Sequence, residues 1–223
     1  MAATLHSGLV VFDLDGTLID SRVQIAGALE AAIAQAGLES LGRAHPGLVG
    51  PPLPTMAAIA LGLPEDDPRV ADVASRFASL YDPVAAEAAV FDGAPEALAA
   101  LRDSGFAMAL ATNKRRAPAL AIARARGWEE LFGAGIYGAE DFGPSSRKAG
   151  ALEQAAERAG RPAFRAMVGD TDADLAACAE ARFGRFMLAT WGARGWAPAA
   201  RFEPAIHAPA DFPELVALAR FWR

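Results

Sequence analysis

Two carboxylates near the N-terminus have a spacing that suits phosphoryl-transfer chemistry. Asp13 and Asp15 stand two residues apart at the end of the apolar run 9–14 (LVVFDL), and Gly16 follows them. Side chains two apart in an extended backbone point the same way, so the two aspartates can converge on one reactive centre. A magnesium ion would allow both carboxylates to coexist beside a phosphate group. Asp13 is therefore the candidate nucleophile, and Asp15 is the candidate proton donor and acceptor.

A second acidic segment, 169–174 (GDTDAD), follows another apolar run. Magnesium prefers hard oxygen ligands, so Asp170 is a candidate metal ligand, with Asp174 as a supporting carboxylate one helical turn later. A calcium-binding EF-hand loop is the competing interpretation of this spacing. It is not supported, because Leu175 stands where that loop requires glycine and Ala181 stands where it requires glutamate. The segment therefore favours a magnesium site shared with the two aspartates of the first motif.

The chain has two lysines among its 21 basic residues, Lys114 and Lys148, and both lie beside predicted strand ends. Lys114 closes the segment Thr112-Asn113-Lys114, where a hydroxyl and the N–H groups of a helix start would hold a phosphate. Lys148 begins a predicted helix, and its ammonium would neutralise charge between carboxylates. Because arginine provides every other basic side chain, the two lysines are candidates for function. Lys148 is assigned to catalysis, and 112–114 to substrate binding.

Short apolar runs alternate with helical patterns along most of the chain, which is typical of a parallel α/β sheet covered by helices on both faces. The predicted strands are 9–14, 106–111, 136–137, 166–168 and 186–188. The predicted helices between and after them are 95–104, 118–126, 148–159, 172–181 and 213–221. Open parallel sheets bind ligands at the carboxyl ends of their strands. Asp13, Thr112 and Asp170 follow three such ends, so we expect them to meet at one edge.

The segment from about 21 to 90 breaks this alternation. It has helical patterns at 23–36, 55–61 and 69–81, joined by proline-rich connections, and it lacks a convincing strand pattern. We therefore predict a helical insert after the first strand. The predicted domains are a catalytic core of residues 1–19 and 92–223 and a helical cap domain of residues 20–91.

Composition limits the classes of partner. At 223 residues the chain is long enough for one sizeable domain with an insert, and its net charge of −6 disfavours binding to nucleic acid or anionic membranes. One cysteine, Cys178, excludes an intrachain disulfide and fits a reducing compartment. We find no secretory signal at the N-terminus and no apolar run near the ~20 residues of a membrane helix. The sequence predicts a cytoplasmic protein, monomer or homodimer, that acts on a small phosphorylated metabolite.

Four motifs, in order, resemble those of the haloacid dehalogenase superfamily, in its phosphoglycolate-phosphatase-like branch. They are DLDGTLIDS (13–21), ATNK (111–114), Lys148, and GDTDAD (169–174). The resemblance implies a Rossmann-like core with strand order 5-4-1-2-3 and a helical cap inserted after the first strand. Relatives commonly have proline after the lysine, whereas this chain has Ala149.

The resemblance also implies roles for the site residues. Asp13 would form an aspartyl-phosphate and bind magnesium, and Asp15 would act as general acid and base while giving the metal its backbone carbonyl. The remaining roles are phosphate binding by Thr112 and Asn113, organisation of phosphate and nucleophile by Lys148, and completion of the metal site by Asp170 with Asp174 nearby.

The sequence therefore predicts a magnesium-dependent phosphatase for a small phosphomonoester, with phosphoglycolate as the leading substrate by resemblance. Three alternatives stay open: a pyrophosphatase or nucleotidase with the same site, a sugar phosphomutase, and a catalytically idle magnesium-binding interaction protein. Dehalogenases of the superfamily lack the second aspartate, so Asp15 favours phosphoryl transfer. Substrate choice is expected to come from the cap. Trp191 is expected to be a packing residue.

Overall fold

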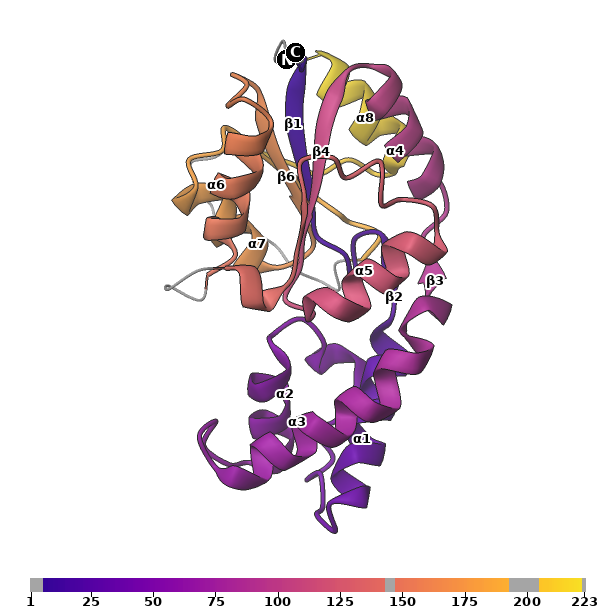
Figure 1. The fold of residues 1–223 in the computed structure, drawn as a ribbon, viewed down its shortest axis with the longest axis vertical. Helices are drawn as coiled ribbons and strands as arrows, with labels where there is room; N and C mark the ends of the chain where they lie inside the picture. Colours follow the sequence, from indigo (N-terminus) through magenta and orange to yellow (C-terminus); the bar gives the residue numbers. More distant parts are fainter. Residues whose placement is uncertain (1–5, 143–146, 193–204, 222–223) are drawn as a thin grey trace. The chain divides into compact units, whose positions relative to one another are not determined.

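The computed structural model describes residues 6–142, 147–192 and 205–221. The chain divides into two compact units, one formed by Met1–Ile19 with Val90–Arg223 and the other by Asp20–Ala89. The domain boundaries expected from the sequence lie within two residues of this division. The first unit contains the parallel sheet, and the second is helical (Figure 1).

The first unit is built on a six-stranded parallel sheet of order β5-β4-β1-β6-β7-β8. The strands are β1 (Gly8–Phe12), β4 (Phe106–Ala111), β5 (Ile136–Tyr137), β6 (Arg165–Gly169), β7 (Arg185–Leu188) and β8 (Ala205–His207). The α/β fold class is confirmed, and the first five strands in sequence follow the expected order 5-4-1-2-3. The observed order differs in one detail, because β8 adds a sixth strand beside β7. This three-residue strand is too short and too mixed in composition to be recognised from periodicity.

Helices cover both faces of this sheet (Figure 1). On one face lie α6 (Ala149–Arg158) and α7 (Asp172–Glu180), and on the other lie α4 (Ala94–Asp103) and α8 (Phe212–Phe221). Because successive strand residues point to opposite faces, Leu9 and Val11 of β1 join the buried cluster beneath α6 and α7. Both faces of the sheet are thus buried, which explains why β1 and β4 are continuous apolar runs. A further helix, α5 (Arg116–Ala125), contacts β5.

The second unit is a small helical assembly. Its α-helices are α1 (Arg22–Gln35), α2 (Leu53–Leu61) and α3 (Pro68–Tyr81), with short 3-10 turns η1 (Pro46–Leu48) and η2 (Asp82–Glu87). Both α1 and α2 pack on α3. The buried face of α3 repeats at helical spacing, and its last two members, Phe77 and Tyr81, have stacked rings with centroids 5.1 Å apart. The chain enters this unit at β2 (Ile19–Asp20) and leaves it at β3 (Ala89–Val90). These two strands pair as a two-stranded sheet.

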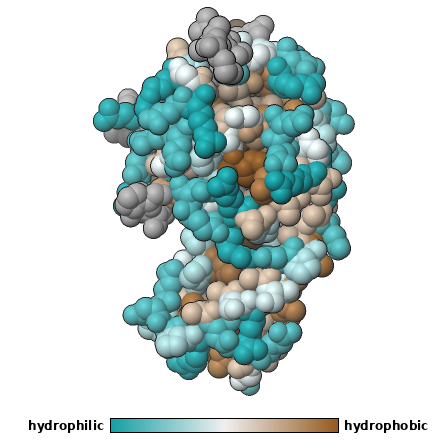
Figure 2. Space-filling model, viewed as in Figure 1, coloured by the Kyte–Doolittle hydropathy of each residue, from teal (hydrophilic) through white to brown (hydrophobic). Residues whose placement is uncertain are grey.

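The visible surface is mostly hydrophilic, with hydrophobic residues gathered in small patches (Figure 2). Most of the large apolar side chains of the described residues are buried, as expected for a packed core. Within the described ranges, we find no helix that is both long enough and apolar enough to span a membrane.

Candidate active site

Three neighbouring strands end at the same edge of the sheet, here called the carboxyl edge, and a predicted site residue follows each one. β1 lies between β4 and β6 and is parallel to both. Asp13 follows β1, Thr112 follows β4 and Asp170 follows β6. The fold therefore brings the three sequence motifs together.

The loop after β1 turns sharply at Gly16, whose φ is 83°. The Gly16 N–H donates a hydrogen bond of 2.8 Å to the carbonyl oxygen of Ile19. A Cβ atom at position 16 would overlap the Asp170 carboxylate. Both the backbone conformation and the lack of space therefore require glycine here, and the tight turn sets the first acidic loop against the end of β6.

Lys148 connects the two acidic segments. Its Nζ lies 2.8 Å from Oδ1 of Asp13 and 2.5 Å from Oδ1 of Asp174. All three side chains are buried, and only 5% of Lys148 is exposed. Burial opposes the lysine charge, but the two carboxylates outweigh it and raise the pKa of Lys148 above its usual value. The lysine is thus a fixed cation, and its ammonium reaches this position without the proline that relatives commonly have after it.

Asp174 is held in place by the first turn of α7. Its Oδ2 accepts hydrogen bonds from the N–H and the hydroxyl of Thr171, at 3.1 and 2.6 Å. The Thr171 hydroxyl in turn accepts from the Asp174 N–H, which completes a capping box at this helix start. A Cβ at Gly169 would lie 2.5 Å from Asp174, so this glycine provides the space that the carboxylate occupies. Local helix chemistry therefore fixes a fully buried carboxylate.

The carboxylates of Asp13, Asp170 and Asp174 form a compact group, with one oxygen from each lying within 4.8 Å of the others. Burial raises the pKa of Asp13 to about 7, with Asp174 and Asp15 adding to the rise and Lys148 opposing it. Burial, followed by the charge of Asp13, raises the pKa of Asp170 to about 8. One lysine does not neutralise three carboxylates, two of them buried and one half-buried. The group fits a bound divalent cation, since a cation would relieve this repulsion and carboxylate oxygens suit magnesium.

The side chain of Asp15 lies outside this group of carboxylates. Its Oδ1 is 3.3 Å from Nζ of Lys114, and both side chains are nearly buried. Three of the four predicted metal ligands, Asp13, Asp170 and Asp174, therefore have carboxylates that lie together. The carboxylate of Asp15 contacts Lys114 instead. This geometry agrees with a separate chemical role for the Asp15 side chain.

The predicted phosphate seat, residues 112–114, lies between β4 and α5. Thr112 is buried, and its hydroxyl accepts a hydrogen bond of 3.1 Å from the Lys114 N–H. This local bond folds residues 112–114 back on themselves, and α5 begins at Arg116, two residues before the predicted start. The Arg116 N–H donates to Glu140 at 2.9 Å. The Arg116 N–H is therefore already paired, and phosphate binding by residues 112–114 stays a prediction.

Sequence reasoning missed a support behind the first acidic loop. The indole N–H of Trp191 donates a hydrogen bond of 2.9 Å to the carbonyl oxygen of Thr17. A Cβ at Gly192 would overlap the Gly16 carbonyl oxygen. The Trp191 ring also packs on Phe212, with centroids 4.3 Å apart, so its expected packing role is only part of its contacts. A Trp-Gly pair directly after the last predicted strand was the available signal.

Fold and site together define a class: an α/β protein with an acidic centre at the carboxyl edge of a parallel sheet. The sequence model of the haloacid dehalogenase-like hydrolases matches residues 8–182. The chain belongs to this family, which confirms the resemblance drawn from its motifs and the prediction of an enzyme.

Individual relatives are similar over most of their length. A phosphoglycolate phosphatase from Cereibacter sphaeroides is 37% identical over 191 residues, which cover 83% of this chain and 86% of the relative. A 5'-nucleotidase from Pseudomonas aeruginosa is 32% identical over 176 residues, covering 78% of each chain. Among solved structures, a haloacid dehalogenase-like hydrolase from Streptococcus pneumoniae has a TM-score of 0.79 at 26% identity, covering 95% of this chain and 97% of that one.

Proposed function

We propose that this protein is a magnesium-dependent phosphatase that hydrolyses a small phosphomonoester through an aspartyl-phosphate on Asp13. One observation carries the proposal: Asp13 stands at a strand end, bonded to the buried cation of Lys148, within a compact group of three carboxylates. A fixed, partly neutralised carboxylate is the arrangement that nucleophilic attack on an anionic phosphate requires.

The first half-reaction forms the aspartyl-phosphate. A carboxylate oxygen of Asp13 attacks phosphorus in line, and the bond from phosphorus to the alcohol oxygen breaks. Asp15 gives its proton to the departing alcohol. Lys148 offsets charge on the phosphoryl oxygens, and Thr112 and Asn113 bind the phosphate. Lys114 holds the Asp15 carboxylate and stays a candidate contact for substrate.

The second half-reaction returns the enzyme to its starting state. Asp15, now ionised, takes a proton from a water molecule, which attacks the phosphorus of the aspartyl-phosphate. The bond from phosphorus to the Asp13 oxygen breaks, so inorganic phosphate leaves and the carboxylate is regenerated. Asp15 regains its proton in this step and is ready for the next substrate.

Asp13, Asp170 and Asp174 are the proposed carboxylates of the magnesium site, with the backbone carbonyl of Asp15. The bound ion would supply charge neutralisation for the nucleophile and the phosphate. Without it, burial and then the repulsion between the carboxylates keep the pKa values of Asp13 and Asp170 raised.

The proposed substrate is a phosphoglycolate-like monoester, supported by the similarity to a phosphoglycolate phosphatase. A nucleotidase is the second candidate, because a relative of nearly equal identity carries that name. We also propose that the helical unit Asp20–Ala89 acts as a cap and selects the substrate. Cytoplasmic localisation and a monomeric or dimeric state stay predictions.

A substrate panel with a matched pair of variants tests the proposal. Purified protein with magnesium is assayed on p-nitrophenyl phosphate, 2-phosphoglycolate and nucleoside monophosphates. Asp13→Asn should lower turnover by about 10³-fold or more, because an amide does not form the phosphoenzyme. Asp103→Asn is the control, since Asp103 lies at the surface beside Arg102. Chelation by EDTA should abolish turnover reversibly. Wild-type turnover by Asp13→Asn would refute the mechanism.

A further inference from the structure

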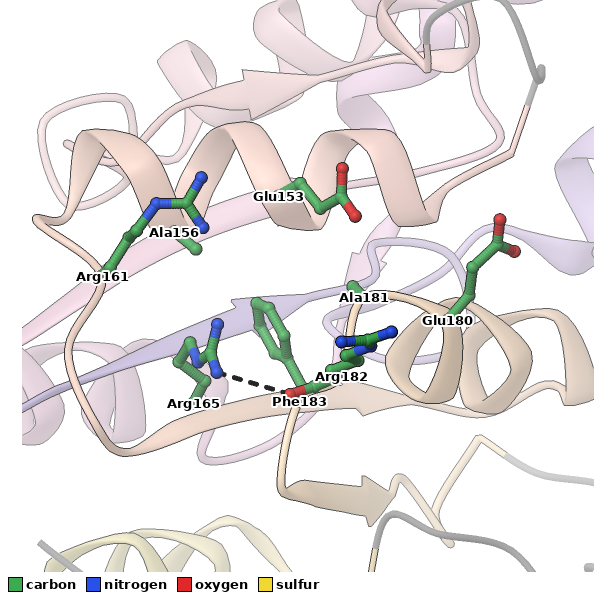
Figure 3. A pocket seen from close by; sticks show the side chains of 8 residues that line it. All are labelled: Glu153, Ala156, Arg161, Arg165, Glu180, Ala181, Arg182 and Phe183. Atoms are coloured by element: carbon green, nitrogen blue, oxygen red, sulfur yellow. Dashed lines mark hydrogen bonds between the residues drawn. The ribbon is translucent and has the colours of Figure 1, made fainter.

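A pocket of about 420 Å³ lies at the opposite edge of the sheet from the acidic site, here called the amino edge (Figure 3). Three arginines line it. Arg161 lies just beyond the end of α6, Arg165 begins β6, and Arg182 lies just beyond the end of α7. Strand β6 separates Arg165, in this arginine pocket, from Asp170 by roughly 17 Å, five steps of about 3.3 Å each.

Arg165 is held in position by its neighbours, and one of its N–H groups has no acceptor among the described residues. One terminal nitrogen donates to the carbonyl oxygen of Arg182 at 3.5 Å, and its Cζ lies 5.5 Å from the ring centroid of Phe183. Its Nε is buried and has no hydrogen-bond partner among the described residues. A buried N–H without an acceptor is unfavourable, so this donor points to an acceptor supplied by a ligand.

The other two arginines adopt a backbone conformation that glycine normally takes. Arg161 has φ of 52° and Arg182 has φ of 54°, and both stand where a chain leaves a helix. Arg182 takes the position after the helix cap where glycine is favoured, and Arg161 follows Gly160, which is also left-handed with φ of 76°. A side chain strains this conformation. Two arginines accept that strain, and both line the same pocket. Strain of this kind is retained where a side chain serves a function.

The charges in the pocket are unevenly distributed. Glu153 and Glu180 also line it, and Glu180 pairs with Arg147 at 3.3 Å. Figure 3 places Arg161 and Arg165 toward one end of the pocket and Glu180 at the other. Arg161 also pairs with Glu157 at 2.6 Å, and this pair is exposed to solvent. The end of the pocket with Arg161 and Arg165 therefore suits an anion. Because the Glu180 carboxylate at the other end repels negative charge, the anion must be small.

We propose that the arginine pocket binds a small oxyanion, a phosphate or carboxylate group, between Arg161 and Arg165. The planar guanidinium fork matches the spacing of two oxygens on such a group, and an ionised acceptor would satisfy the buried Nε of Arg165. The site lies apart from the acidic centre, and binding there does not require turnover.

Calorimetric titration of the purified chain with inorganic phosphate and, separately, with malonate tests this site. Both titrations are done in EDTA, because the metal-free acidic site carries three carboxylates and one lysine and disfavours anions. Arg161→Asn keeps a residue that tolerates the left-handed conformation, and Arg165→Gln removes the buried donor. The control is Arg124→Gln, which removes an exposed arginine paired with Glu129 outside the pocket.

The proposal expects saturable binding of at least one probe, weakened about tenfold or more in Arg161→Asn and Arg165→Gln and unchanged in the control, since a charge-assisted hydrogen bond is of that size. Binding of phosphate alone or malonate alone would identify the preferred group. If neither probe binds, the arginines serve only the helix ends and the proposal is wrong. Equal binding by Arg161→Asn and the control would also overturn it, even if Arg165→Gln does not fold.

Discussion

The same two helices, α6 and α7, present opposite chemistry at their two ends. At their N-terminal ends stand Lys148 and Asp174, buried and bonded to each other at 2.5 Å. Beyond their C-terminal ends stand Arg161 and Arg182, both exposed to solvent. The helix dipole favours an anion at the first end and cations at the second, so Asp174 and the arginines all lie where the dipole favours their charge.

Burial, rather than the kind of charge, separates the two ends. At the carboxyl edge, Asp13, Asp174 and Lys148 are buried, and the pKa values of Asp13, Asp170 and Lys148 shift strongly. At the amino edge, the ion pair of Arg161 with Glu157 remains in solvent. Exposed pairs contribute little to stability, whereas breaking a buried pair leaves an uncompensated charge. Equivalent substitutions at the two edges should therefore have unequal effects.

The largest difference is expected for removal of a cation from each edge. Lys148→Met leaves Asp13 and Asp174 without their cation, so the free energy of unfolding of the metal-free protein should fall by about 3 kcal/mol at pH 8. Turnover should fall by about 10²-fold or more. Urea denaturation in EDTA measures the first effect, and an assay with magnesium measures the second.

The matched variant at the amino edge is Arg161→Asn. Because it removes only an exposed ion pair, the free energy of unfolding should fall by less than about 0.5 kcal/mol. The loss in Lys148→Met should also shrink at pH 5, because Asp13, whose pKa is raised to about 7, is then protonated. Equal destabilisation by the two variants would break the contrast between buried and exposed charge.

A second comparison uses one glycine from each edge. Gly192→Ala forces a methyl group against the Gly16 carbonyl oxygen, and backbone atoms do not move away cheaply. We expect a loss of about 2 kcal/mol in the free energy of unfolding, together with lower turnover, because the Gly16 loop carries Asp13 and Asp15. Gly184→Ala, near the start of β7, meets no atom within 4 Å and should be close to neutral. Thermal unfolding and an activity assay compare the two variants. Equal turnover by Gly192→Ala and Gly184→Ala would contradict this account.

A third comparison concerns pH. The folded state raises the pKa of Asp170 from 3.8 to about 8, so it binds that proton more tightly than the unfolded chain. The stability of the metal-free protein should therefore fall as pH rises from about 4 to 8. Asp170→Asn removes this cost and should stabilise the metal-free protein at pH 9 by on the order of 1 kcal/mol, with a smaller gain at pH 5. Magnesium should stabilise the wild type more than the variant. An equal response of both proteins to magnesium would remove Asp170 from the metal site.

The carboxyl edge was largely predictable from the sequence. Asp13, Thr112 and Asp170 each follow an apolar run, and parallel strands must end together, so local patterns were enough to place them at one edge. The partner of Asp15 was not predictable, because the contact with Lys114 joins residues 99 positions apart through side-chain orientation. The helix after Thr112 was predicted at 118–126 and forms at Arg116–Ala125, so its position was predicted to within two residues.

The amino edge could not be predicted at all. Arg161, Arg165 and Arg182 look like other arginines in a chain where arginine is the usual basic residue. Their shared pocket depends on two left-handed residues and on the pairing of β6 with β7, which only the folded chain reveals. Strand β8 escaped detection for a related reason, because pairing with β7 and not its own composition makes it a strand.

The smallest expected effect separates folding from binding at the amino edge. Arg182→Gly replaces a strained left-handed residue with the residue that suits this conformation best, so the free energy of unfolding should rise by up to about 1 kcal/mol. Arg124→Gly, in the last turn of α5, should instead lower it by up to about 1 kcal/mol, because glycine is a poor helix former. If Arg182 is kept for a ligand, the stabilised variant should also bind phosphate or malonate more weakly in EDTA. If Arg182→Gly is more stable than the wild type and binds both anions with the same affinity as the wild type, the strain at Arg182 has no function in this pocket.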